Sequence, residues 1–141
     1  MRSLPEPMPG LGAMPARLHA IGFTAWKRPY LRLCLAPAEL VHVRTPAQVP
    51  AGADAVLWGA RHRGAELAHC RSVLRIEDGF LRSVGLGADL VRPLSWVIDS
   101  RGLHYDPAQA SDLEWLLCSP VAPALLARAA RLRESIVAAR L

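Results

Sequence analysis

Short apolar runs alternate with segments of helical spacing in the first half of this chain, and this alternation limits the fold more than any other feature. Each run is short enough to be a buried strand. The runs cover His19–Phe23, Glu39–Thr45, Ala55–Gly59 and Ser72–Ile76. Strands that alternate with helical segments are typical of α/β folds with a mostly parallel sheet. We therefore expect a Rossmann-like α/β chain.

Helical segments are expected between and after these runs. They cover Ala25–Leu35, Gly64–Cys70, Ser111–Cys118 and Ala122–Leu141. Pro29 must lie in the first turn of its helix or kink it, because proline lacks the backbone N–H. Ser111 and Glu114 have the spacing of a capping box, which predicts where the third helix begins. The last segment has no stop signal, so we expect the chain to be an incomplete module.

A β-hairpin is predicted between the last apolar run and the third helix. Ser95–Ile98 and Leu103–Tyr105 have the pattern of two short strands, and Asp99–Gly102 has the pattern of a turn that ends at glycine. Turn and cap roles account for Asp99 and Asp106, so neither is assigned to a site.

The length and composition indicate one domain. The chain has 141 residues, of which 52% are apolar and 21% charged, so it can bury a core. Residues 1–17 contain four prolines and little periodicity, and we expect them to be disordered. Residues 18–141 are then the folded domain.

Several functional classes are excluded by composition. The net charge is +5, but the arginines are scattered and show no aromatic–basic pattern of a nucleic-acid site. Cys34, Cys70 and Cys118 lie far apart without zinc spacing, which indicates free thiols in a reducing compartment and no metal site. No run of 18 apolar residues or signal peptide is present, so we expect a cytoplasmic protein.

Two adjacent acids and a glycine, Glu77, Asp78 and Gly79, follow directly after the run Ser72–Ile76. Ligands of open α/β sheets bind beyond the carboxyl ends of the strands, which is where these acids are expected. Partial desolvation raises the pKa of a carboxyl group toward the range that suits proton transfer. Gly79 would let the backbone turn and a ligand approach.

Arg82 and Ser83 come next and are candidates for holding an anionic substrate, because arginine grips a carboxylate through two donors. A purely structural interpretation also stays open, in which Asp78–Gly79 is an ordinary turn and Glu77 forms an ion pair with Arg82. Neighbouring residues on a strand point to opposite faces, so the acids make a poor paired-carboxylate glycosidase site. One acid toward substrate and one holding the loop fits better.

Three further features have weaker claims to function. Trp58, which precedes Gly59, is expected in the core or lining the crevice. His104 and Tyr105 alternate on a predicted strand, so one of them faces inward. Gly85–Leu90 is rich in glycine but lacks the strand–turn–helix context of a phosphate-binding loop.

The stretch from Arg75 to Leu117 closely resembles the capsule polysaccharide biosynthesis family typified by the KpsC-type β-Kdo transferases, where Kdo is 3-deoxy-D-manno-oct-2-ulosonic acid. The matching motifs, in order, are Glu77–Ser83, Pro93–Ser95, Val97–Asp99, Tyr105–Asp106 and Ser111–Glu114. The resemblance covers residues 19–141. His104 departs from a tyrosine common in the family, and Trp96 from an aliphatic residue.

The resemblance implies the first, acceptor-side Rossmann-like domain of a GT-B glycosyltransferase, truncated before the second domain. Such an enzyme transfers Kdo from CMP-Kdo with retention of the β configuration. The implied acceptor is a phosphatidylglycerol- or Kdo-terminated glycolipid, so peripheral contact with the inner membrane is expected. This chain alone is expected to be inactive, and the alternative is a non-catalytic binding or structural fragment of the same family.

The resemblance also assigns roles to particular residues. It implies that Glu77 and Asp78 are catalytic. It implies substrate binding by Gly79, Arg82, Ser83, Trp58, Gly59 and Tyr105. No cofactor beyond the donor substrate and no metal is implied.

Overall fold

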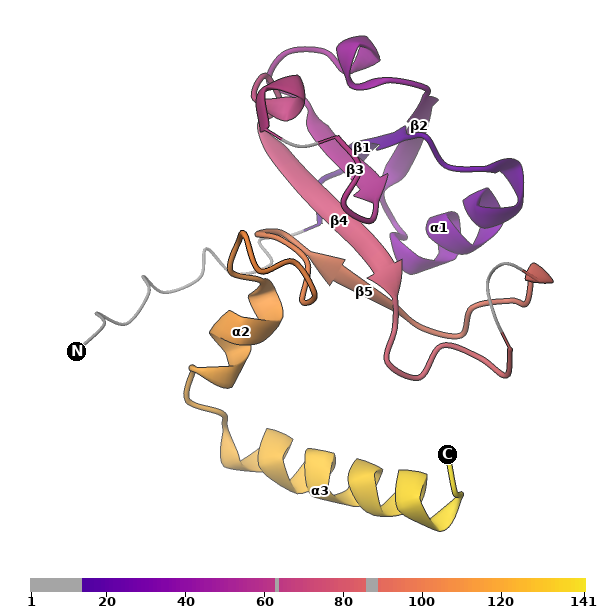
Figure 1. Cartoon of the computed structure of the whole chain (residues 1–141), viewed down its shortest axis with the longest axis vertical. Coiled ribbons are helices and arrows are strands. Elements are labelled where there is room, and N and C mark those ends of the chain that lie inside the picture. The colour runs from indigo at the N-terminus through magenta and orange to yellow at the C-terminus, as the bar shows by residue number, and fades with distance from the viewer. Residues whose placement is uncertain (1–13, 63, 86–88) are drawn as a thin grey trace.

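The computed structural model describes residues 14–62, 64–85 and 89–141, and its centre is a five-stranded sheet (Figure 1). The strands are β1 (Arg17–Ile21), β2 (Glu39–Val43), β3 (Asp54–Trp58), β4 (Ser72–Asp78) and β5 (Trp96–Asp99). Their order across the sheet is β2-β1-β3-β4-β5, and every pairing is parallel except that of β4 with β5. The predicted α/β fold with a mostly parallel sheet is therefore confirmed.

Three α-helices and three short 3₁₀ helices accompany the sheet in the described residues. They are α1 (Arg28–Cys34), α2 (Asp112–Leu117) and α3 (Pro123–Ala138), with 3₁₀ helices at Ala25–Lys27, Pro46–Gln48 and Gly64–Leu67. Pro29 lies in the first turn of α1, where its missing N–H costs no hydrogen bond. The predicted helix at Gly64–Cys70 is only the last of these 3₁₀ helices.

The predicted hairpin between Ser95–Ile98 and Leu103–Tyr105 is wrong. β5 pairs antiparallel with β4, and Leu103–Tyr105 forms no strand. The long edge of β4 takes β5 as its partner. The chain after β5 is then bent by the buried Asp99, whose Oδ1 accepts hydrogen bonds from the N–H groups of Arg101 and Gly102 at 2.8 and 2.7 Å. A side chain, not a second strand, holds this turn.

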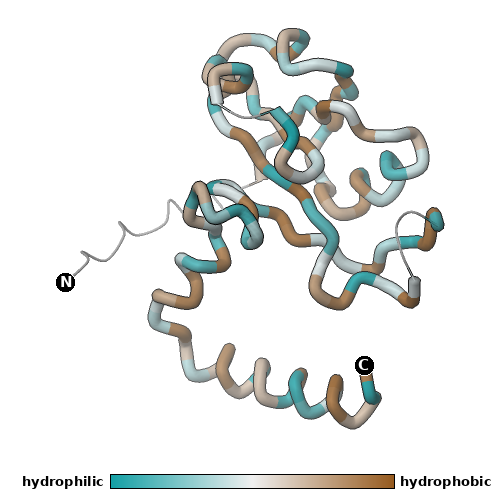
Figure 2. Tube along the Cα trace, viewed as in Figure 1, coloured by the Kyte–Doolittle hydropathy of each residue, from teal (hydrophilic) through white to brown (hydrophobic). Residues whose placement is uncertain are grey.

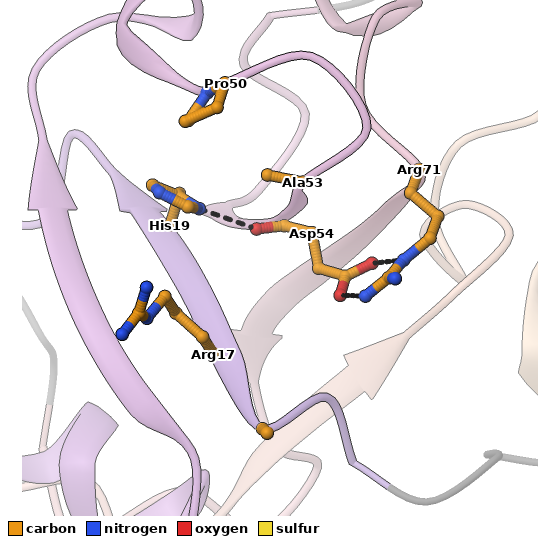
Figure 3. Close-up of a pocket in the computed structure, with 7 residues that line it drawn as sticks. Arg17, His19, Pro50, Ala53, Asp54 and Arg71 are labelled. Carbon is orange, nitrogen blue, oxygen red and sulfur yellow. Dashed lines mark hydrogen bonds and ion pairs between the residues drawn. The ribbon is translucent and has the colours of Figure 1, made fainter.

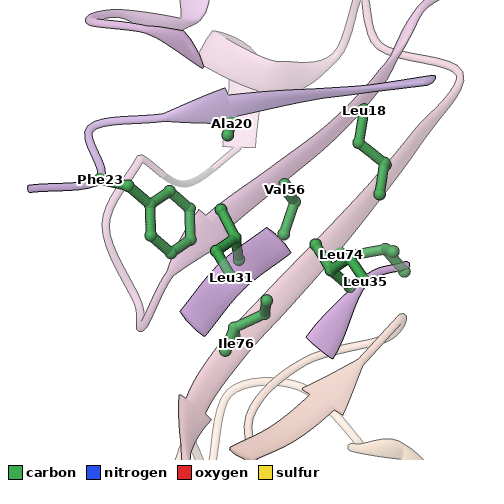
Figure 4. Packing of buried hydrophobic residues seen from close by; sticks show 8 residues of the cluster. All are labelled: Leu18, Ala20, Phe23, Leu31, Leu35, Val56, Leu74 and Ile76. Atoms are coloured by element: carbon green, nitrogen blue, oxygen red, sulfur yellow. The ribbon is translucent and has the colours of Figure 1, made fainter. Parts of the chain in front are cut away.

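Apolar side chains cover both faces of the sheet. On one face α1 packs over the strands, and Figure 4 shows the resulting cluster of Leu18, Ala20, Phe23, Leu31, Leu35, Val56, Leu74 and Ile76. A second cluster on buried strand positions joins Ile21, Val49, Ala55, Leu57 and Leu67. Burial on both faces explains why these strands are continuous apolar runs in the sequence.

The capping box at α2 is confirmed. The N–H of Glu114 donates to Ser111 Oγ at 3.2 Å, and the N–H of Ser111 donates to Glu114 Oε2 at 2.7 Å. By contrast, no residue of α3 is buried. Figure 1 shows α3 extending away from the sheet, and Figure 2 shows apolar and polar residues alternating along it.

The expected N-terminal segment lies mostly outside the described residues, which begin at Met14, and Arg17 already belongs to β1. Within the described part of the chain, every helix is too short or too polar to cross a membrane.

Candidate active site at the carboxyl edge of the sheet

The carboxyl ends of β3 and β4 lie side by side. Trp58 pairs with Ile76 in the parallel ladder, and the N–H of Gly59 donates to the carbonyl of Ile76 at 2.8 Å. The sheet therefore brings Trp58 and Gly59 next to Glu77 and Asp78, although about 20 residues separate the two pairs along the chain. These four residues form the centre of the candidate site.

The two acids face opposite sides of the sheet. β4 continues through Asp78, so neighbouring side chains alternate, and the strand does not end before the acids as the sequence suggested. Glu77 lies on the side of Gly59 and Tyr105, while Asp78 pairs across the ladder with Trp96. This division fits the expectation of two acids with two separate roles.

The half-buried Glu77 carboxylate is held on both of its oxygens. The phenol of Tyr105 donates to Oε2 at 2.9 Å, and the N–H of Asp78 donates to Oε1 at 3.0 Å. Gly59 has φ +62°, and a Cβ there would lie 3.2 Å from Oε2. Only glycine combines this backbone conformation with so close an approach to the carboxylate. The fold thus gathers Glu77, Gly59 and Tyr105, three of the predicted site residues.

Arg75 holds the loop that follows Gly59, a role that sequence reasoning missed. Its guanidinium donates to the carbonyls of Gly59, Arg61 and His62 at 2.8, 3.0 and 3.0 Å. Arg75 and Glu77 lie two residues apart on β4 and so share a face. The arginine therefore supports the backbone against which Glu77 packs.

Asp78, not Glu77, forms the ion pair with Arg82, at 2.7 Å between Oδ1 and Nε. The other guanidinium nitrogens donate to Ser83 Oγ at 2.5 Å and to the carbonyl of Val91 at 2.9 Å. The ion pair of the structural interpretation exists, but with the other acid as partner. Arg82 and Ser83 therefore fasten the loop after β4.

Position 79 requires glycine because a side chain there would collide with Ser95, not because the backbone adopts an unusual conformation. A Cβ at this position would lie 2.9 Å from the Cβ of Ser95, and the N–H of Gly79 donates to the carbonyl of Ser95 at 3.1 Å. The space beside Gly79 is thus filled by the segment that enters β5, whereas the sequence suggested room for a ligand.

Aromatic rings gather on the Asp78 side of the sheet. Trp58 packs edge-to-face against Phe23 and Trp96, with ring centroids 6.4 and 5.3 Å apart. Trp58 is half-buried and packs against the core cluster, which is the first of the two roles considered for it. On its ring lies the ammonium of Lys27, 3.0 Å from the centroid.

Lys27 was missed by sequence reasoning as a site residue. Burial lowers the pKa of the Lys27 ammonium, and the nearby carboxylates of Asp78 and Glu77 oppose that shift. The available signal was that Lys27 is the single lysine among 17 Lys and Arg residues. Its contact with Trp58 joins residues far apart in sequence, which spacing alone does not reveal.

Of the weaker candidates, His104 packs between the rings of Phe80 and Tyr105, with centroids 4.9 and 5.3 Å away. Asp99 has the turn role expected of it, and Asp106 caps a turn through a 3.1 Å hydrogen bond from the N–H of Ala108.

A pocket at the opposite, amino-terminal edge of the sheet has a structural role (Figure 3). Its Asp54 carboxylate accepts hydrogen bonds from the Arg71 guanidinium and from Ser72 Oγ, which ties the start of β3 to the start of β4. His19 contacts the carbonyl of Asp54 at 3.3 Å. In the part of the chain that the structure describes, no three His, Cys, Asp or Glu side chains are grouped to hold a metal.

Comparison with known proteins places this geometry in context. Residues 53–139 match the sequence model of a family described as capsule polysaccharide biosynthesis protein. The chain is 36% identical over 109 residues to the lipopolysaccharide-processing protein LpsZ of Rhizobium meliloti, which covers 68% of this chain and 25% of LpsZ. It is also 36% identical over 111 residues to the capsule polysaccharide modification protein LipA of Neisseria meningitidis serogroup A, covering 71% and 16% of the two chains.

A solved structure is similar as well. KpsC of Thermosulfurimonas dismutans, described as a β-Kdo 2,7 transferase, superposes with a TM-score of 0.63 and 26% sequence identity. The match covers 84% of this chain and 41% of that one. The chain thus spans a quarter or less of the two sequence relatives and less than half of this structure.

Proposed function

Because the chain belongs to the capsule polysaccharide biosynthesis family, we propose that it forms part of a glycosyltransferase that moves Kdo from CMP-Kdo to a lipid or Kdo acceptor. The observation that carries this proposal is the Glu77 carboxylate, held between Gly59 and Tyr105 at the carboxyl edge of a parallel sheet. Ligands of such sheets bind at this edge. The likeness to a β-Kdo 2,7 transferase supports the same reaction class.

In the proposed reaction Glu77 takes the proton of the acceptor hydroxyl. As the bond from the anomeric carbon of Kdo to the phosphate oxygen breaks and CMP leaves with the bonding electrons, the acceptor oxygen forms the new bond to that carbon from the same face. The net result is retention of the β configuration. Tyr105 keeps the carboxylate oriented by donating to Oε2, which leaves the second lone pair of each oxygen for the substrate.

Asp78 is proposed to act through charge and position. Its ion pair with Arg82 fixes the start of the loop after β4, beside the aromatic cluster. Arg82 and Ser83 were expected to hold the sugar carboxylate. Because Arg82 pairs with Asp78 and donates to Ser83 and Val91, we propose that both residues support substrate binding by fixing this loop.

The proposal extends to the whole enzyme. In a GT-B arrangement the active site lies between two Rossmann-like domains, and the described residues form a single sheet. We therefore propose that these 141 residues bind the acceptor side and do not catalyse transfer alone. A net charge of +5 suits an anionic donor and an anionic glycolipid acceptor at the cytoplasmic face of the inner membrane. A second candidate is a module of the same family that binds the acceptor without turnover.

A transfer assay tests the proposal. CMP-Kdo is mixed with a fluorescent acceptor that ends in Kdo or lysophosphatidylglycerol, and the product is identified by mass spectrometry and its anomeric configuration by NMR. The 141-residue chain is compared with the longer product of any reading frame that continues the family sequence. We expect a β-linked product only from the longer form. Folded proteins that yield no product in either form would contradict the transferase, and binding without product would favour the second candidate.

A further inference from the structure

Lys27 occupies an unusual position for a lysine. Lys27 is half-buried, and its ammonium lies 3.0 Å from the centroid of the Trp58 ring, at the carboxyl edge of the sheet. Trp58 is itself fixed by the rings of Phe23 and Trp96. The ammonium of a lysine is usually solvated at the end of a flexible four-carbon chain. Packing on Trp58 instead holds the Lys27 ammonium in one position.

The ammonium has no hydrogen bond or ion pair with any described residue. The two nearby carboxylates already have partners, since Asp78 pairs with Arg82 and Glu77 accepts from Tyr105. Cation–π attraction to Trp58 stabilises the charge but satisfies none of the three N–H donors. A half-desolvated ammonium with free donors attracts an anionic acceptor more strongly than an exposed one does.

Arg82 cannot supply this function as it stands. Its Nε is paired with Asp78, and its other nitrogens donate to Ser83 and Val91. Lys27 therefore offers its N–H donors beside the acids, in a neighbourhood to which Arg61 and Arg82 also contribute positive charge. Burial lowers the pKa of Lys27, the carboxylates of Asp78 and Glu77 oppose this shift, and the guanidinium groups of Arg82 and Arg61 add to it.

We propose that Lys27 binds an oxyanion of the substrate, a carboxylate or a phosphate, at the face of Trp58. The identity of that substrate as a Kdo sugar or its CMP ester rests on the proposed function. The binding chemistry does not, because an ammonium held on an aromatic face recognises any oxyanion that fits. Lys27 is then a binding residue on the Asp78 side of the sheet, opposite the side that holds Glu77.

The single lysine makes a direct test possible in the unaltered chain. Trinitrobenzenesulfonate labels amines, so Lys27 and the α-amino group are the reactive sites, and peptide mass spectrometry separates them. Labelling rates are measured with CMP, with Kdo, with inorganic phosphate and with acetate. We expect an anion to slow labelling of Lys27 severalfold while the α-amino group reacts unchanged. Equal labelling of Lys27 with and without every anion would overturn the inference.

The four probes separate the sources of the oxyanion. Protection by CMP and phosphate assigns Lys27 to a phosphate, and protection by Kdo and acetate assigns it to a carboxylate. Protection by the simple anions without CMP or Kdo would support the oxyanion site and count against the proposed substrate. Protection by Kdo or CMP in a protein that transfers no sugar would support the site and leave the transferase proposal contradicted.

Substitution provides a second, independent readout. Titration calorimetry with the protecting anion is compared for Lys27→Met and for Arg32→Met, which removes the same charge from an exposed position on α1. We expect about 10- to 100-fold weaker binding for Lys27→Met, because a charged hydrogen bond contributes about 1.5–3 kcal/mol, and little change for Arg32→Met. Lys27→Arg should restore part of the affinity. Equal weakening by Lys27→Met and Arg32→Met would overturn a specific site.

Discussion

At the residue scale, strand geometry separates two neighbouring acids. Glu77 packs against Gly59 and Tyr105, while Asp78 pairs with Arg82 on the other face. The Glu77 carboxylate is therefore positioned against the backbone of Gly59, and the Asp78 carboxylate fastens the loop after β4. The two neighbouring acids have different partners because adjacent strand residues point to opposite faces of the sheet.

Gly59→Ala should disturb the Glu77 side of the site. The left-handed backbone at φ +62° costs a residue with a Cβ about 1–2 kcal/mol, and the new methyl would lie 3.2 Å from Glu77 Oε2. We expect a lower melting temperature, measured by circular dichroism. Gly52→Ala, with φ +74° and open space around it, is the matched control for backbone strain alone. If Gly59→Ala and Gly52→Ala lower the melting temperature equally, contact with Glu77 contributes nothing beyond the backbone strain.

The Asp54 carboxylate predicts acid sensitivity. Its hydrogen bond from Arg71, with help from Ser72, lowers the pKa of Asp54 in the folded state. The stabilisation is thus present above the unfolded pKa of about 3.9 and is lost as the pH falls through the folded value. Urea unfolding should show a cost of Asp54→Asn near neutral pH that shrinks below about pH 4. The exposed pair Arg17–Glu39 is the control, and a cost of Asp54→Asn independent of pH would contradict this account.

At the element scale, the turn after β5 is organised by one buried carboxylate. Asp99 accepts from the N–H groups of Arg101 and Gly102 through Oδ1, and from the N–H of Asp112 through Oδ2 at 2.9 Å. Asp112 in turn accepts from the N–H of Ser100 at 2.6 Å. These contacts join the end of β5 to the start of α2, and the segment between them places Tyr105 beside Glu77.

Asp99→Ala should therefore destabilise the fold more than the loss of side-chain volume alone would. Three backbone donors would lose their acceptor in a buried position, and we expect a cost of about 2–4 kcal/mol in urea unfolding. Asp106→Ala is the control, because Asp106 caps an exposed turn through Ala108. Similar costs for the two variants would show that the Asp99 contacts do not organise this region.

Sequence reasoning succeeded where local signals act alone. The strands β1 to β4 followed from apolar runs, and the start of α2 followed from Ser111 and Glu114. The hairpin failed because turn residues after β5 do not reveal which strand β5 will pair with. Lys27 was missed because its position on Trp58 depends on how α1 and β3 pack together.

At the scale of the whole molecule, α3 carries an uncovered apolar face. Leu125 and Leu132 are 54% and 57% exposed, and they lie two turns apart on the same side of the helix. Exposed apolar surface of this kind promotes association. The effect of this face in solution is measurable as self-association of the chain.

Replacing Leu125 and Leu132 with glutamine should reduce self-association of the 141-residue chain. Because neither side chain is buried, the melting temperature should change little. Light scattering over a concentration series measures the first effect, and Arg131→Gln on the polar side of α3 is the control. A wild-type chain that stays monomeric at high concentration, or a large drop in melting temperature, would contradict this reading of α3.

The central claim, that Glu77 is the acid of an acceptor-binding edge, is tested most directly by the rate of Kdo transfer in the longest product of the reading frame. Glu77→Gln keeps the size of the side chain, and its amide can accept from the N–H of Asp78 while donating to the Tyr105 hydroxyl, so we predict at least about 10²-fold slower transfer with little change in melting temperature. Glu134→Gln, on the exposed face of α3, should transfer at the wild-type rate. The account would be contradicted if Glu77→Gln transferred Kdo at the wild-type rate, or if its transfer fell only in proportion to its loss of stability.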